Sequence, residues 1–89
     1  MTDVARPIVF WQSARKHRIG RRRAHEVMGS AAPERIDGRE GRDALLCWVG
    51  EDARGLMLEV IALDLPEAIV VIHVMPLYRG RKVRDAEEK

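Results

Sequence analysis

The sequence has little that would suit an oxidising or membrane environment. Its only cysteine is Cys47, so the chain cannot form an internal disulfide, and a cytoplasmic location is the natural expectation. The apolar run at 68–72 stops at His73, far short of the roughly 20 residues that a membrane-spanning helix needs. The first residues lack a long apolar stretch followed by a small-residue cleavage site, so we expect no secretion signal and no membrane partner.

Common catalytic signatures are also missing. The three histidines, His17, His25 and His73, do not combine with the single cysteine at the spacing of a zinc site. There is no glycine-rich phosphate-binding loop, and neither Ser13 nor Ser30 lies in the context of a catalytic nucleophile. The sequence therefore predicts no metal and no other cofactor, so any catalysis would depend on ordinary side chains.

Charge is plentiful but unevenly distributed. The formal net charge is only +2, yet residues 1–25 carry +6, residues 26–78 carry −6 and residues 79–89 carry +2. Arginine outnumbers lysine by 13 to 3, and the arginine fork can bind a phosphate through two parallel hydrogen bonds. This asymmetry favours a nucleic acid or another acidic partner. A solvated surface with clustered charges would give the same pattern.

The length of 89 residues predicts one small domain over 1–89 with a modest core, ending in a flexible basic tail from about residue 79. Residues 8–11 are either a first strand or the apolar entry to a helix. The other predicted elements are helices at 12–17 and 21–28 and strands at 33–36, 44–49, 56–64 and 68–75. We therefore expect an α+β fold in which two short N-terminal helices pack on one face of an antiparallel meander sheet. The other face would be partly open, and a homodimer contact or a partner protein would cover it.

The strand expected at 56–64 alternates between two apolar faces. Leu58 and Val60 belong to one face, whereas Glu59 lies among apolar residues on the other. In the next strand, His73 interrupts a similar apolar face. Glu59 is either a solvated carboxylate or a group poised for proton transfer. His73 is either a hydrogen-bonded, half-buried imidazole or a second group poised for proton transfer.

Cleavage of RNA by its own 2′-hydroxyl group needs a base, an acid and cations, and no metal. A basic chain with histidines can supply all of these. The catalytic candidates are His17, His73 and Glu59 for proton transfer and Lys16, Arg79 and Arg81 for phosphate charge. The candidates for RNA binding are Arg15, Arg18, Arg21, Arg22, Arg23 and Tyr78. Trp11 and Trp48 are expected to fill the core, and the side chains of Arg21 to Arg23 are expected to face water.

Three stretches resemble the BrnT-like toxins of the RelE superfamily. "RKHRIGRRRAHEVM" is similar to the Lys-His segment and second helix of that family, "GEDARGLMLEVIALD" to its strand pair, and "AIVVIHVMPLYRGRK" to its last strand. The similar region covers about residues 10–82. Lys16 and His17 match the Lys-His pair, whereas Gly20 replaces a helix-capping Ser. The arginine of the family's last strand is absent, and Arg79 and Arg81 are its nearest substitutes.

This resemblance implies a RelE-like fold and the toxin half of a bacterial type II toxin–antitoxin pair. It also implies a metal-independent endoribonuclease that inhibits translation, with RNA and a cognate antitoxin as partners. Two alternatives stay open: a nucleic-acid-binding module in which the helix pair acts as a helix-turn-helix, and a partner-binding protein without catalysis. A recognition helix is usually longer than the second helix expected here. A small adjoining partner gene would favour the toxin.

Overall fold

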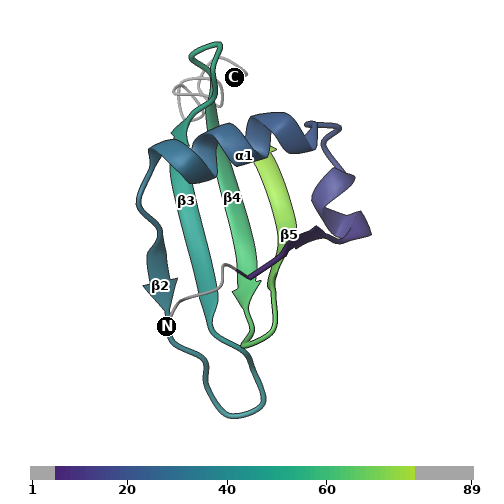
Figure 1. Cartoon of the computed structure of the whole chain (residues 1–89), viewed down its shortest axis with the longest axis vertical. Coiled ribbons are helices and arrows are strands. Elements are labelled where there is room, and N and C mark those ends of the chain that lie inside the picture. Colours follow the sequence, from purple (N-terminus) through teal and green to yellow (C-terminus); the bar gives the residue numbers. More distant parts are fainter. Residues whose placement is uncertain (1–5, 78–89) are drawn as a thin grey trace, which may run out of the picture.

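A five-stranded mixed sheet organises the protein, and the computed structural model describes the chain over residues 6–77 (Figure 1). The strands lie in the order β1-β5-β4-β3-β2. Their bounds are β1 Ile8–Phe10, β2 Glu34–Ile36, β3 Leu45–Glu51, β4 Met57–Asp64 and β5 Ile69–Pro76. The fold is α+β as expected, and each strand predicted after residue 32 is present. The predicted C-terminal tail lies outside the described residues.

The sheet is not wholly antiparallel, which corrects one expectation. β2 to β5 form antiparallel pairs with their neighbours, but β1 lies parallel to β5, with Phe10 opposite Val71. The chain between β1 and β5 is long enough to return to the sheet edge in the same direction, which parallel pairing requires. A strand of three residues carries no pattern that specifies its direction, so the sequence could not indicate this pairing.

Within residues 6–77, one α-helix is present where two were expected. α1 covers Arg21–Ser30, but the earlier segment forms only the short 3-10 turn η1, Gln12–Arg15. Arg18 has a φ of 58° and lies in the left-handed region, which ends any right-handed helix. The chain must pass from the sheet edge to the start of α1 between Trp11 and Gly20. Few residues are available, and they form a turn instead of a helix.

α1 lies across one face of the sheet and encloses the core (Figure 1). Ala24 and Val27 of α1 are fully buried. Gly50 of β3 lets the helix approach closely, since a Cβ atom at this position would be 3.1 Å from Ala31 Cβ. The sheet residues buried with the helix are Leu46, Trp48, Leu58, Val60, Ala62, Val71 and Val74. Burial of this apolar surface is the main favourable contribution to folding.

Asp52 fastens α1 to the turn between β3 and β4. Its carboxylate is buried and accepts hydrogen bonds from the backbone N–H groups of Arg54 and Leu56 and from Arg23 Nε, the last at 2.7 Å. Burial raises the pKa of Asp52, but these donors and the positive charge of Arg23 outweigh that effect and lower the pKa to about 2.

The substitution Asp52→Asn is expected to reduce the acid sensitivity of the fold. Because the pKa in the folded state lies below the ordinary value of 3.8, the carboxylate stabilises the protein above about pH 4. This contribution is lost as the pH falls through about 2. Urea unfolding should therefore show the variant to be less stable at pH 6, with a difference from the native chain that shrinks towards pH 2. The control Asp43→Asn removes an exposed carboxylate and should change stability by less than about 0.5 kcal/mol. A difference that is constant with pH would contradict this role.

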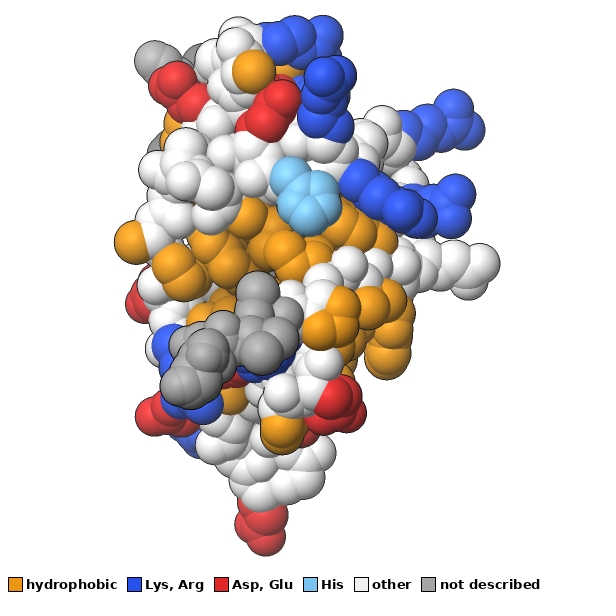
Figure 2. All heavy atoms as spheres, viewed as in Figure 1, with side chains coloured by type: hydrophobic (Ala, Val, Ile, Leu, Met, Phe, Trp, Pro, Cys, Tyr) orange, Lys and Arg blue, Asp and Glu red, His pale blue; other side chains and the backbone are white. Residues whose placement is uncertain are grey.

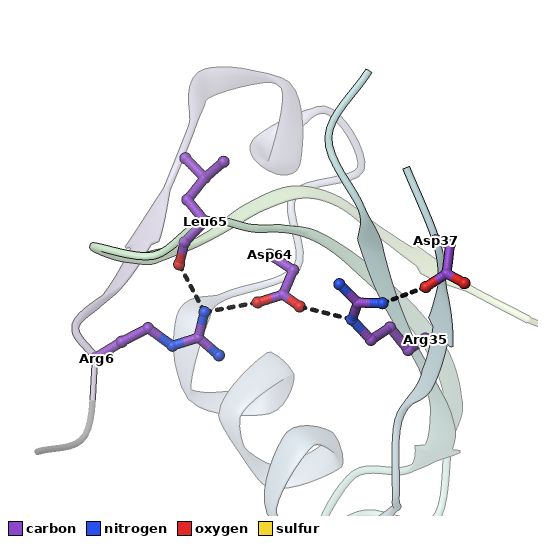
Figure 3. A network of polar contacts seen from close by, with 5 residues as sticks. All are labelled: Arg6, Arg35, Asp37, Asp64 and Leu65. Atoms are coloured by element: carbon purple, nitrogen blue, oxygen red, sulfur yellow. Dashed lines mark hydrogen bonds and ion pairs between the residues drawn. The ribbon is translucent and has the colours of Figure 1, made fainter. Parts of the chain in front are cut away.

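A second ionic network ties the segment just before β1 to the end of β4 and to β2 (Figure 3). Asp64 at the end of β4 accepts hydrogen bonds from Arg6 Nη1 at 2.6 Å and from Arg35 Nε at 3.0 Å. Arg6 also donates to the carbonyl oxygen of Leu65, and Arg35 pairs with Asp37. The hydrogen bonds from Arg6 and Arg35 lower the pKa of Asp64. Two arginines that contribute to the positive charge are therefore engaged within the fold.

Candidate functional site

The sheet face opposite α1 is largely apolar, and we call it the open face. It contains alternate residues of β4, Met57, Glu59, Ile61 and Leu63, and the residues paired with them: Leu45, Cys47, Val49, Glu51, Val70, His73 and Met75. Val49 is 45% exposed there. Within residues 6–77, α1 lies only on the other face. The expectation of a partly open face is therefore consistent with the arrangement.

Glu59, His73 and His17 lie together at the β5 side of the open face. His73 Nε2 is 3.2 Å from Glu59 Oε1, and both side chains are about one third exposed or less. The His17 ring meets the His73 ring edge to face, with 6.2 Å between the ring centroids. These residues are named here the His-Glu cluster. They come from three segments: strand β4, strand β5 and the loop that precedes α1.

An irregularity in β5 sets the position of His73. His73 pairs with Ile61, but Val71 pairs with Ala62, so Ile72 is an extra residue in the ladder. Consequently Val71 points into the core and His73 points to the open face, although a regular strand would place both on the same face, as the sequence pattern suggested. The bulge is therefore what places His73 within reach of Glu59.

The turn η1 holds His17 beside this bulge. Ser13 Oγ donates a hydrogen bond of 2.8 Å to the carbonyl oxygen of Ile72, and the backbone N–H of Trp11 donates to Val71. The turn ends at Arg15, and the left-handed conformation of Arg18 then redirects the chain. His17, which lies between them, is exposed, and the turn that precedes it is hydrogen-bonded to β5.

Cations surround this turn. Arg15, Lys16 and Arg18 are exposed, as is Arg21 at the start of α1, and within residues 6–77 none of the four forms an ion pair. Figure 2, viewed from the α1 side of the sheet, shows Lys and Arg side chains projecting from the upper and right-hand parts of the molecule. An ordered cationic surface without acidic partners can bind an anionic ligand with a smaller loss of entropy than a free tail.

Arg22 and Arg23 differ from this group. Arg22 lies 3.9 Å from Glu26, a weak exposed pair. Arg23 is only 25% exposed at its side chain and pairs with the buried Asp52. The expectation that the side chains of Arg21 to Arg23 all face water is wrong for Arg23, because its guanidinium group has a structural partner 29 residues further along the chain. Arg23 is better regarded as part of the fold than as an RNA-binding residue.

The structure thus brings together three predicted catalytic residues, His17, Glu59 and His73, with Lys16 next to His17 in the chain. The predicted residues Tyr78, Arg79 and Arg81 lie outside the described residues. Sequence reasoning missed Trp11, which is 52% exposed although it was expected in the core, while Trp48 is buried as expected. The position of Trp11 directly after a short apolar strand could have signalled an edge location.

The cluster is suited to proton transfer. Two imidazoles and a carboxylate can hold a proton in several arrangements, and Glu59 can accept a hydrogen bond from the His73 ring. Cys47 on the same face is a poor nucleophile, because burial and then the charges of Glu59 and Glu34 raise its pKa. Within residues 6–77, no three His, Cys, Asp or Glu side chains converge as a metal site would require.

No protein-family model matches this chain, and comparison with curated proteins and with solved structures finds no match either. Within the described part of the chain, no helix is both long and apolar enough to cross a membrane.

Proposed function

We propose that this protein is a metal-independent endoribonuclease, acting in the cytoplasm as the toxin of a bacterial type II toxin–antitoxin pair. The observation that supports the proposal is the His-Glu cluster beside the exposed cations of η1 and the loop that follows it. Proton-transfer groups and phosphate-binding groups are the two requirements for cleaving RNA through its own 2′-hydroxyl group. The resemblance to BrnT-like toxins agrees with this chemistry.

The proposed reaction is a transesterification. His17 takes the proton of the 2′-hydroxyl group, whose oxygen forms a bond to phosphorus, while the bond from phosphorus to the 5′ oxygen breaks. A doubly protonated His73 donates a proton to that leaving oxygen. Glu59 holds His73 in position through its hydrogen bond. Lys16 stabilises the charge that develops on the phosphate, a role for which Arg79 and Arg81 are further candidates. The products are a 2′,3′-cyclic phosphate and a 5′-hydroxyl end.

A direct assay tests the proposal. A labelled single-stranded RNA, incubated with the purified full chain in excess chelator, is expected to give products that end in a 2′,3′-cyclic phosphate. A matched RNA with 2′-O-methyl groups throughout should stay intact, because the attacking group is blocked. Cleavage of both substrates, or of neither, would contradict the proposed chemistry.

Binding should depend on the unpaired cations. The double substitution Arg15→Gln and Arg18→Gln is expected to weaken RNA binding and to reduce the slope of log affinity against log salt by about 0.7 for each lost phosphate contact. Fluorescence anisotropy with the 2′-O-methyl RNA at several salt concentrations measures this slope. The control Arg42→Gln replaces an exposed arginine in the loop between β2 and β3, and should leave the slope unchanged. Equal slopes for all three proteins would argue against these phosphate contacts.

A partner-binding protein without catalysis is the second candidate. The apolar open face favours it, together with the exposed side chains of Val9, Ile36 and Val49, because exposed apolar patches often mark interaction sites. A cognate antitoxin or a second copy of the chain would be the partner. Under this alternative, Val49→Glu would disrupt the complex, and substitutions in the His-Glu cluster would have no effect on growth arrest. A helix-turn-helix is not present in residues 6–77, because η1 is a single 3-10 turn.

A further inference from the structure

Trp11 is a large apolar side chain in an exposed position. It is 52% exposed, the highest value among the exposed large hydrophobic residues of the described chain. Its backbone is nevertheless well anchored, because its N–H group donates to the carbonyl oxygen of Val71 at 3.0 Å and its own carbonyl accepts from Ala14. An ordered backbone with an exposed indole ring is an arrangement suited to contact with a ligand.

The direction of the strand places Trp11 towards the His-Glu cluster. Phe10 pairs with Val71 and packs against the core on the α1 side, where the guanidinium group of Arg21 lies over its ring. Trp11 follows with an extended backbone, φ −80° and ψ 163°, so its side chain turns to the opposite side of the strand. That is the side to which His73 points.

The surroundings of Trp11 suit a single-stranded nucleic acid. Arg15, Lys16 and Arg18 follow it within seven residues, all exposed and without ion pairs in the described part of the chain. An aromatic ring beside a row of cations is the usual way in which proteins bind unpaired strands: the bases stack on the ring and the phosphates contact the cations. In a duplex the bases are already stacked on one another, so the indole ring would have no base available.

We propose that Trp11 is a base-stacking residue, which makes an unpaired RNA strand the preferred ligand of this surface. The inference takes its ligand class from the proposed function, but it concerns binding and not the chemical step. Stacking of one base on Trp11 would place the adjoining phosphate towards His17 and His73. Trp11 is thus a specificity residue that selects unpaired RNA over duplex RNA.

The experiment measures binding without cleavage. The probe is a ten-nucleotide 2′-O-methyl RNA, used as a single strand and as the matching duplex, with the full chain and its variants in fluorescence anisotropy. Trp11→Ala is expected to weaken binding of the single strand by roughly 5- to 150-fold, while Trp11→Phe retains most of the affinity. Binding of the duplex should change little. The control Ile36→Ala alters a side chain of similar exposure, 49%, at the opposite edge of the sheet, and should bind as the native chain does.

Intrinsic fluorescence gives an independent readout. Because Trp48 is buried, quenching by the single strand should come from Trp11 and should disappear in Trp11→Phe. Affinity that is unchanged in Trp11→Ala would overturn the inference, as would an equal loss for single strand and duplex. Loss of self-association in Trp11→Ala with unchanged RNA affinity would identify Trp11 as a protein contact and also overturn it. If the single strand binds through Trp11 but unmodified RNA stays intact, the inference holds and the proposed cleavage fails.

Discussion

Replacing His73 by glutamine is expected to lower the rate of RNA cleavage by about 100-fold or more, the usual contribution of a positioned acid or base. Glutamine has a similar size and can still hydrogen-bond to Glu59, so the sheet should retain its structure. It cannot donate a proton to the leaving oxygen. Cleavage of labelled RNA under single-turnover conditions measures the effect, and the same variant should no longer arrest growth when it is expressed.

The matched control is His25→Gln. His25 is an exposed histidine that lies on α1 against Phe10, with 5.5 Å between the ring centroids, on the other side of the sheet from Glu59. This variant should cleave at nearly the native rate. Glu59→Gln should lower the rate less than the His73 variant does and should change the pH profile, since Glu59 acts by positioning His73. Equal rates for the two histidine variants would remove the cluster from the mechanism.

The substitution Leu58→Ala is expected to destabilise the fold by about 3 kcal/mol. Leu58 is fully buried near the start of β4, and removal of a buried leucine side chain forfeits its transfer free energy and leaves a cavity. A small domain has a total stability of only about 5–15 kcal/mol, so this loss is a large part of the margin. Urea unfolding followed by circular dichroism measures it.

Leu56→Ala provides the comparison within the same hairpin. Leu56 is only two residues away but is 44% exposed, so its truncation should change the free energy of unfolding by less than about 0.5 kcal/mol. Similar losses for the two variants would mean that Leu58 is no more deeply buried than Leu56. The pair therefore tests whether the core begins at Leu58.

The faces of β4 could be predicted from the sequence, because strand side chains alternate with a period of two. Leu58 and Val60 are buried under α1 and Glu59 lies on the opposite face, as the pattern indicated. The same rule failed for His73 and Val71, since the bulge at Ile72 reverses the alternation within β5. A single extra residue in a continuous apolar run leaves no sign in the local pattern.

The candidate site was accessible to sequence reasoning only as a set of residue types. Histidines next to cations suggested proton transfer and phosphate binding, and Glu59 stood out as a charge in an apolar strand. The contact between His17 and His73 joins residues 56 positions apart, and no local pattern encodes such a distance. Trp11 was assigned to the core from its residue type alone, because tryptophan is usually well buried.

By itself, the sequence determined that the chain forms an α+β domain, where its strands lie and which side of β4 is apolar towards the helix. These features depend on residues that are neighbours along the chain, through their periodicity and turn chemistry. Only the tertiary structure decided the parallel pairing of β1, the pairing of Arg23 with Asp52 and the meeting of His17 with Glu59 and His73. Each of these depends on which distant segments come together in space, and that is fixed by packing of the whole core and not by any local stretch.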